Sequence, residues 1–260
     1  MSSSNSVHAI QKQVVLVTGG ARGLGAAITR AFLNENARVV INYHQSAQAA
    51  KALAALHPDR ALPVQADVTD LQSVRALVEH AQEHFGQPIT TVINNALPQF
   101  SFDADGRAMP DTLEAAELMR QFEGVVVGAL HTVQAALAGM KQQGFGRIVN
   151  IGTNLFQHPV VPYHDYTAAK AALLSFTRTL ANDLGPCGIT VNMVSGGLLR
   201  TTDASAATPP AVFDLIAENT PLRKVTTPEE FADTALFFAS PWSRAVTGQN
   251  LLVDGGLVKG

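Results

Sequence analysis

One stretch near the start of the chain limits the possible folds more than any other. The apolar run from Val14 to Val17 leads directly into a glycine-rich segment, Thr18 to Gly25, and a helical apolar pattern follows. A short run rich in β-branched residues is typical of a buried parallel strand. Glycines in such a turn let the backbone approach a pyrophosphate, and the next helix offers it free N–H groups. The segment therefore predicts an α/β fold with a pyrophosphate-binding turn rather than a glycine-rich surface turn.

A second constraint is the pair Tyr166 and Lys170, which opens an alanine-rich run later in the chain. On a helix, residues four apart lie on the same face, so an ammonium group would stand one turn from a phenol. A nearby positive charge favours the ionised phenol and lowers its pKa. The spacing is that of a tuned proton donor, although taken alone it also fits an exposed pair on an ordinary helix.

Strand and helix patterns alternate along the rest of the chain, which predicts a parallel sheet with helices on both faces. Apolar runs predict strands over residues 14–17, 38–42, 61–65, 89–93, 147–151, 188–193 and 250–253. No linker, repeat or low-complexity segment interrupts this series. We therefore expect one domain over residues 10–260, after a loose N-terminal tail over residues 1–9.

Helical patterns fill the intervals between these strands. Helices are expected over residues 46–56, from Leu71 onward, from Gln121 to Met140 and up to Leu184. Either Thr69 or Asp70 can cap the helix that follows the third strand. Thr227 and Glu230 have the spacing of a capping box for a last long helix, with Pro228 at its first position.

Composition narrows the classes of protein that fit. The 260 residues are 47% hydrophobic and only 15% charged, with a net charge of −3 and one cysteine, Cys187. Because the chain has no long basic run, nucleic acid is not an expected partner. No apolar run approaches the ~18 residues of a membrane span, and the first residues lack the apolar core of a signal peptide. We expect a cytoplasmic protein without a disulfide, and the low charged fraction favours a surface covered by other subunits.

The two motifs together resemble those of the short-chain dehydrogenase/reductase family. The chain carries that family's TGxxxGxG loop and YxxxK motif in the expected order, as Thr18, Gly19, Gly23, Gly25, Tyr166 and Lys170. The resemblance extends from about Val14 to Gly256, which is nearly the whole chain. It implies a Rossmann-type doubly wound parallel sheet of about seven strands and a nicotinamide cofactor.

The resemblance also implies roles for individual residues. Tyr166 would donate a proton, Lys170 would lower its pKa and hold the ribose, and Thr153 would replace the family's serine thirteen residues before the tyrosine. Thr153 is alternatively a structural hydroxyl at a strand end, and Tyr163, which lacks the lysine, is expected in the pocket wall. The implied cofactor contacts are Gly19, Arg22, Gly23, Leu24, Gly25, Asn42, Tyr43, Asp67, Val68, Asn94, Asn95, Ala96, Tyr166, Lys170, Gly197 and Thr201.

The end of the second predicted strand bears on which nicotinamide cofactor fits. NAD-binding proteins place an acid there for the ribose hydroxyls, but this chain has Asn42, Tyr43 and His44. Arg22 can bind a 2′-phosphate as a permanently charged planar donor, unless it is simply solvated. We therefore expect NADP(H) to be favoured over NAD(H). Asp67 matches the family's adenine contact, or else it caps a helix.

Three positions depart from the family's pattern. Leu97 replaces a glycine, and Gly196 replaces a proline, so that a looser backbone is expected at position 196. Val125 falls where the family has an asparagine that orders a water linking the lysine to solvent. Valine cannot hold that water, but a bend between Gly124 and Gly128 could let a backbone carbonyl hold it instead.

Two loops are expected to shape the substrate pocket. The long loop from Pro98 to Asp111 contains Phe100 and Phe102, which are pocket residues or core plugs with equal support. A segment rich in Ala, Thr and Pro, about residues 196–222, is the expected substrate lid. His158 and His164 are read as loop residues without the spacing of metal ligands, so no metal is expected.

These features predict NADP(H)-dependent interconversion of a carbonyl and a secondary alcohol by a homo-oligomer, a dimer or a tetramer. The branch of the family that reduces 3-oxoacyl thioesters is the most similar, but the same residues would serve a keto-sugar, a small ketone or a pterin. The alternative is a nucleotide-binding homologue with weak or no catalysis that acts as a regulator or subunit. The three departures favour it, and the retained Tyr166 and Lys170 count against it.

Overall fold

The computed structural model describes residues 8–97, 100, 102–103, 105–206 and 208–259. Within them, parallel strands form a seven-stranded sheet in the order β3-β2-β1-β4-β5-β6-β7. The strands are β1 (Val14–Val17), β2 (Arg38–Tyr43), β3 (Ala61–Gln65), β4 (Thr91–Asn94), β5 (Gly146–Thr153), β6 (Ile189–Gly196) and β7 (Asn250–Val253). The strand order reverses between β1 and β4, where open α/β sheets bind ligands. The predicted doubly wound sheet is confirmed.

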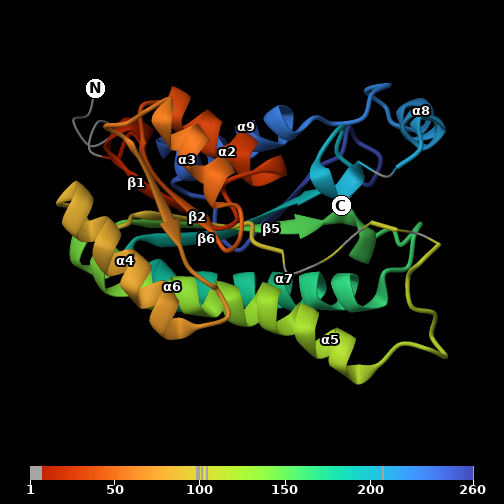
Figure 1. Cartoon of the computed structure of the whole chain (residues 1–260), viewed down its shortest axis with the longest axis horizontal. Coiled ribbons are helices and arrows are strands. Elements are labelled where there is room, and N and C mark those ends of the chain that lie inside the picture. The colour runs from red at the N-terminus through yellow and green to blue at the C-terminus, as the bar shows by residue number, and fades with distance from the viewer. Residues whose placement is uncertain (1–7, 98–99, 101, 104, 207, 260) are drawn as a thin grey trace.

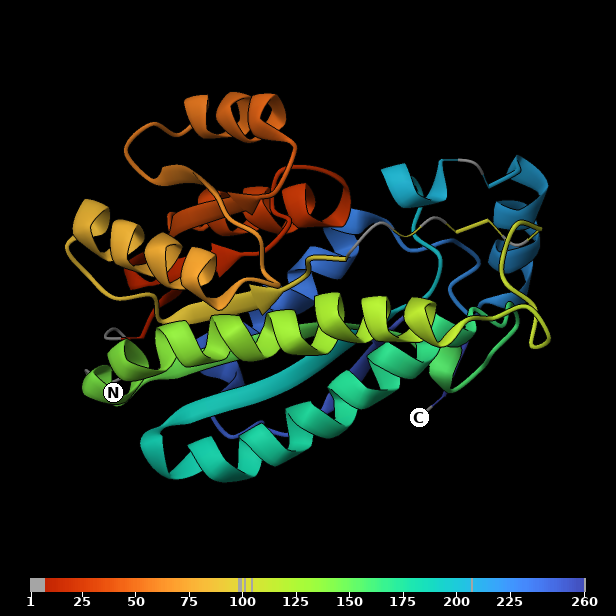
Figure 2. The same ribbon diagram turned by 60° about the horizontal axis from the view of Figure 1, so that its bottom comes forward.

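Helices cover both faces of this sheet (Figure 1). One face carries α2 (Gly23–Asn34), α3 (Ala47–Ala55) and α9 (Pro228–Ala239), and the other carries α4 (Leu71–Phe85), α6 (Gly128–Gln143) and α7 (His164–Leu184). The helix α5 (Ala115–Phe122) leads into α6 and runs beside α7, as the turned view also shows (Figure 2). The short helix α8 (Pro210–Asn219) stands apart from both layers, on the side toward which β5 points (Figure 1).

Burial of both sheet faces explains the apolar strand sequences. Every residue from Val14 to Val17 is at most 1% exposed, as expected for the central strand of a parallel sheet. Phe32, Phe231 and Phe238 fill the layer between the sheet and helices α2 and α9. On the other face, Met140 of α6 is among the buried residues that pack with the sheet and α4. Burying each such side chain contributes roughly 1.5–3 kcal/mol to the stability of the fold, relative to leaving it exposed.

Most element boundaries agree with the sequence predictions. Asp70 caps α4, since its carboxylate accepts a hydrogen bond from the backbone N–H of Gln72 at 2.9 Å. The capping box of Thr227 and Glu230 is present at the start of α9. The predicted fifth and sixth strands were too short, because their polar C-terminal residues continue the pairing of β5 with β6 as far as Thr153.

Two further features concern the surface. The described end of the predicted N-terminal tail, His8, stacks on Phe145 with ring centres 4.2 Å apart, and residues 1–7 lie outside the described part of the chain. The helical stretch Ala115–Gln143 is long and apolar enough to cross a membrane by length and composition alone, with a mean hydropathy of 1.2. It packs against the sheet and α7, and the core helix of a soluble protein has the same composition.

Candidate active site

The glycine-rich segment forms the turn between β1 and α2. Gly19 and Gly23 have φ angles of +61° and +54°, a left-handed conformation that glycine adopts without steric cost. A Cβ at Gly25 would lie only 2.1 Å from the carbonyl oxygen of Gly19, so no side chain fits there. Arg22 is the N-cap of α2, and no side-chain hydrogen bond caps this helix among the described residues. The turn therefore fits the pyrophosphate of a dinucleotide.

Neighbouring strands hold this turn in place. Asn42 Oδ1 accepts from the backbone N–H of Gly19 at 3.2 Å, and its Nδ2 donates to the carbonyl of Ala66 at 3.0 Å. Asn95 Nδ2 donates to the carbonyl of Thr18 at 2.9 Å, and the Thr18 hydroxyl accepts from the backbone N–H of Asn95 at 2.9 Å. Asn42 is 2% exposed, and both polar atoms of its side chain are bonded within the protein. This side chain positions the turn, so the predicted cofactor contact is not made through a free polar atom of it.

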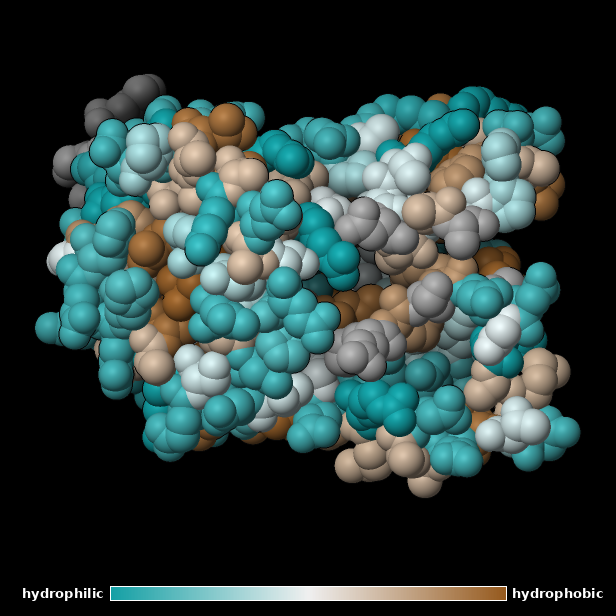
Figure 3. Space-filling model, in the orientation of Figure 1, coloured by the Kyte–Doolittle hydropathy of each residue, from teal (hydrophilic) through white to brown (hydrophobic). Residues whose placement is uncertain are grey.

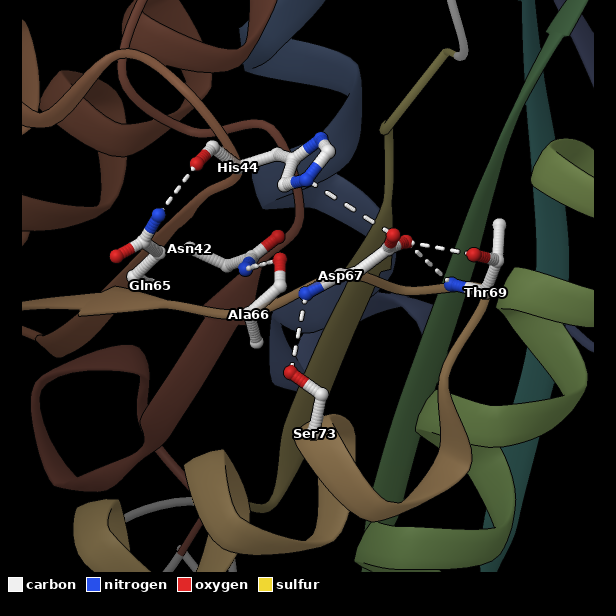
Figure 4. Close-up of polar contacts among 7 residues, drawn as sticks. All are labelled: Asn42, His44, Gln65, Ala66, Asp67, Thr69 and Ser73. Atoms are coloured by element: carbon white, nitrogen blue, oxygen red, sulfur yellow. Dashed lines mark hydrogen bonds and ion pairs between the residues drawn. The ribbon is translucent and has the colours of Figure 1, made fainter.

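The ends of β2 and β3 present an exposed pair of a histidine and a carboxylate (Figure 4). His44 Nε2 lies 3.8 Å from Asp67 Oδ2, while the backbone N–H and the hydroxyl of Thr69 donate to Asp67 Oδ1 at 2.9 and 2.7 Å. Burial alone would raise the pKa of Asp67, but these hydrogen bonds and the charge of His44 hold the pKa below its usual value. Asp67 forms a turn with Thr69 and is not a helix cap, which leaves its carboxylate at the sheet edge.

The adjacent Tyr43 differs from its expected role. Its side chain is only 8% exposed and packs within the core between the sheet and α2. The residue exposed at this strand end is His44, whose side chain is 63% exposed and to which the sequence analysis gave no role. Its position was readable from the sequence, but its pairing with Asp67 depends on the sheet register of β2 and β3.

The three predicted catalytic residues meet where β5 ends and α7 begins. Thr153 lies beside the Tyr166 phenol, close enough to lower its pKa, and Lys170 Nζ lies 5.7 Å from the centre of the Tyr166 ring. Lys170 donates to the carbonyl oxygen of Ile151 at 2.6 Å. Thr153, Tyr166 and Lys170 are 4%, 5% and 3% exposed, so solvent is almost excluded from all three.

Burial shifts the pKa values of both Tyr166 and Lys170. Desolvation raises the pKa of Tyr166 to about 12, and the hydrogen bond from Thr153 only partly offsets it. Desolvation also lowers the pKa of Lys170 to about 8. In the protein alone, the lost solvation of the phenolate dominates the pKa of Tyr166, so the lowering expected from Lys170 does not set its value.

A buried hydrogen-bond chain beside the site was missed in the sequence. The Thr132 hydroxyl donates to Asn94 Oδ1 at 2.6 Å, Asn94 Nδ2 donates to Asn150 Oδ1 at 2.8 Å, and Asn150 Nδ2 donates to the Thr177 hydroxyl at 2.8 Å. It links β4, β5, α6 and α7. Asn94, expected at the cofactor, uses its side chain here instead. The available signal was Asn150, a polar residue inside an apolar strand.

Comparison with known proteins agrees with this geometry. A family model described as enoyl-(acyl carrier protein) reductase matches residues 19–258. The 3-oxoacyl-[acyl-carrier-protein] reductases of Synechocystis sp. and Pseudomonas aeruginosa are 32% and 33% identical, with 96% and 95% of this chain and 98% of each relative covered. Cyclohexanol dehydrogenase of Rhodococcus sp. is 32% identical, with 95% of this chain and 97% of that protein covered. The chain belongs to the short-chain dehydrogenase/reductase family.

Within this oxidoreductase family, the chain resembles the 3-oxoacyl-[acyl-carrier-protein] reductase branch, and its departures now have a structural setting. The helix predicted from Gln121 to Met140 is interrupted by a π-helical turn, η2 (Glu123–Val127), between α5 and α6. Such turns are rare in proteins, and those that occur are often found at functional sites. The predicted weak point between Gly124 and Gly128 is thus confirmed. These glycines, with Lys170 and the 4% exposed Val125, line a small pocket.

Two of the departures from the short-chain dehydrogenase/reductase pattern belong to one apolar region. Leu97 packs against a buried cluster formed by Val125, Ala129, Ala169, Leu173 and Met193. Leucine and valine thus stand where the family has a glycine and an amide. These apolar side chains contribute to the desolvation that shifts the pKa values of Tyr166 and Lys170.

The third departure does not loosen the backbone. Gly196 belongs to β6 and pairs with Thr153 on one side and Val253 on the other, so the expected loosening is wrong. A Cβ at Gly196 would lie 2.8 Å from the ring of Phe231, which explains why a residue without a side chain is present. The glycine serves the packing of α9 against the sheet.

The predicted lid, residues 196–222, contains a short helical turn, η5 (Asp203–Ser205), and α8. Ser205 is buried and its hydroxyl donates to the carbonyl of Leu199 at 2.8 Å, which anchors the first part of the segment. Thr201, expected beside the nicotinamide, is exposed here. Gly197 lies next to Asn154, since a Cβ there would be 2.9 Å from the amide nitrogen of that residue.

The loop predicted from Pro98 to Asp111 packs against Tyr166. Pro98 itself lies outside the described residues, but Phe100 and Phe102 both contact the Tyr166 ring. Figure 3 shows a hollow on this face of the molecule, with hydrophobic atoms at its floor. His164, expected in a loop, is instead the first residue of α7.

Proposed function

We propose that this protein is an NADP(H)-dependent oxidoreductase that interconverts a carbonyl and a secondary alcohol. The observation that carries the proposal is the close grouping of Thr153, Tyr166 and Lys170, at the edge of the sheet that also holds the glycine turn. A bound nicotinamide would supply or accept the hydride. Two residues of the chain act on the substrate oxygen. Tyr166 exchanges a proton with it, and Thr153 holds it in place.

Lys170 has two tasks in this proposal. Its Nζ, now bonded to the Ile151 carbonyl, would hold the hydroxyls of the cofactor ribose. Its charge, 5.7 Å from the centre of the Tyr166 ring, favours the phenolate against the effect of burial. The π turn leaves a pocket beside Lys170, and a water held there by a backbone carbonyl would return protons to the tyrosine.

The cofactor preference rests on the end of β2. No acid stands among Asn42, Tyr43 and His44, so a 2′-phosphate meets no carboxylate from this strand end. Arg22, at the start of α2, supplies a permanent positive charge. These residues favour NADP(H) over NAD(H).

The names of similar proteins suggest which carbonyl compounds are candidate substrates. Two of them are named as 3-oxoacyl-[acyl-carrier-protein] reductases and one as a cyclohexanol dehydrogenase, so both open-chain and ring carbonyls fall within the range. We place the protein in the cytoplasm as a homodimer or homotetramer. Exposed apolar side chains on α5, Met119 and Phe122, and Leu251 on the edge strand β7 support contacts between subunits.

A second candidate function is nucleotide binding with little or no catalysis, in a regulator or subunit. The observation that favours it is the closed state of the proton donor: Tyr166 is 5% exposed, and the pKa of its phenol is about 12.

One experiment separates the two. NADPH binding is measured by its fluorescence, and NADPH oxidation is followed at the nicotinamide absorbance over a panel of 3-oxoacyl thioesters, cyclic ketones, aryl ketones and keto-sugars. Turnover of any of these supports the reductase. Tight NADPH binding without oxidation across the panel favours the second candidate.

A further inference from the structure

Three aromatic rings pack around the ring of Tyr166, the proposed proton donor. Phe100 stacks on Tyr166, with ring centres 4.7 Å apart and ring planes at 20°. Phe102 meets Tyr166 edge-on at 5.5 Å, and it meets Phe100 edge-on at 5.0 Å. Tyr163 meets Phe100 edge-on at 5.4 Å. The Phe100 ring therefore occupies a slot that one ring bounds with its face and two rings bound at steep angles.

This slot lies where a substrate must come. A carbonyl oxygen has to reach the Tyr166 hydroxyl, and the Phe100 ring covers the face of that phenol. Phe100 belongs to a loop outside the helices and strands and is itself partly exposed, so its ring can leave without disturbing the sheet. The ring in the slot stands in the position that part of a substrate would take.

The inference that follows rests on the proposed function and names its substrate class. We propose that the substrate carries its carbonyl on a flat, unsaturated six-membered ring, and that this ring takes the slot that Phe100 fills here. Aromatic rings prefer stacked or edge-on partners with centres about 4.5–7 Å apart, and the slot offers both kinds. A flexible acyl chain gains nothing from this geometry beyond burial of apolar surface.

Charge near the slot points to an uncharged substrate. The pKa of Tyr163 is raised, first by burial and then by the negative charges of Asp103 and Asp105, against a single opposing positive charge on Arg107. Both acids are exposed on the loop that carries Phe102. On this loop a substrate with phosphate groups would meet two acids and one arginine, whereas a neutral aryl ketone would not be repelled.

The test compares two ketones of similar size that differ in the ring, acetophenone and cyclohexyl methyl ketone. For each, kcat/KM with NADPH is measured in the unchanged protein and in Phe102→Leu, which keeps an apolar side chain but removes one ring of the slot. The ratio of kcat/KM for acetophenone to that for cyclohexyl methyl ketone should fall about fivefold in the variant. Phe85→Leu, at the far end of α4, is the matched control and should leave the ratio unchanged.

Binding supplies a second readout that needs no turnover. Benzamide and cyclohexanecarboxamide, which are not reduced, are titrated calorimetrically into the protein saturated with NADP⁺, and benzamide should bind at least fivefold more tightly. Equal binding of the two amides, binding of neither, or an unchanged ketone ratio in Phe102→Leu would overturn the slot. Selective benzamide binding without reduction of any ketone would keep the slot and count against the proposed function.

Discussion

At the scale of single residues, we propose the phenol of Tyr166 as the acid of the site. We expect Tyr166→Phe to lower kcat at least ~10²-fold with NADPH binding largely retained, because only the proton donor is removed. Steady-state kinetics and NADPH fluorescence titration measure the two effects. Tyr163→Phe is the matched control, since it removes a neighbouring phenol from the same ring cluster. A damaging Tyr163→Phe with a harmless Tyr166→Phe would mean that the roles of the two tyrosines are reversed.

Lys170→Ala should differ from Tyr166→Phe by harming both turnover and cofactor affinity. The lysine is proposed to contact the ribose as well as to tune the phenol, whereas the tyrosine mainly serves the proton. The same fluorescence titration distinguishes the two variants. Unchanged NADPH affinity in Lys170→Ala would remove the ribose contact from the proposal.

Arg22 should set the cofactor preference. The unchanged protein should bind NADPH at least tenfold more tightly than NADH, a difference of about 1.4 kcal/mol. Arg22→Ala should erase most of this difference, while Arg22→Lys should keep part of it, because a lysine retains the charge without the planar donor pair. Calorimetric titration with both cofactors gives the numbers. Equal affinities in the unchanged protein would contradict the proposal.

At the scale of elements, we propose that the π turn η2 replaces a side chain that the family uses. Val125 has no polar atom, yet the irregular backbone around it leaves a pocket next to Lys170. If a backbone carbonyl holds the water there, Val125→Asn should raise kcat or leave it unchanged, with little change in KM for NADPH. Val125→Ala, which removes bulk without adding an amide, is the control for altered packing. A large loss of activity in folded Val125→Asn would show that the apolar side chain has its own role.

The elements also show what could be read from the sequence. The strand positions and the glycine turn were predictable, because apolar periodicity and glycine positions act locally. The stacking of Phe100 on Tyr166 was not, since two segments more than sixty residues apart must first be brought together by the sheet. The side-chain directions of Asn42 and Asn94 were missed for the same reason. Buried amides bond to whatever the fold places beside them, and sequence alone does not show that partner.

At the scale of the whole molecule, the buried lysine makes stability depend on pH. The pKa of Lys170 falls from 10.5 to about 8 on folding, so between these values the unfolded chain binds more protons than the folded one. The free energy of unfolding therefore rises with pH in this window, by about 1.5 kcal/mol from pH 8 to 9.5. Above pH 10 the raised pKa of Tyr166 acts in the opposite direction.

Urea unfolding at pH 8 and pH 9.5, without cofactor, measures this effect. Lys170→Met keeps a long apolar side chain without the charge and should lose most of the rise. A free energy of unfolding that falls over this range in the unchanged protein, or an equal rise in Lys170→Met, would show that other groups control the pH dependence.

The packing of α2 against α9 also affects how the protein is made. The central strand β1 and its helix α2 leave the ribosome well before α9, so Phe32 finds its partners Phe231 and Phe238 only after α9 has been synthesised. At roughly 5–20 residues per second, the intervening 199 residues (231 − 32) take about 10–40 s. Throughout that time the apolar face of α2 lacks its final cover. We therefore expect a ribosome-associated chaperone to protect this face of the nascent chain, and slow translation before α9 would prolong that need.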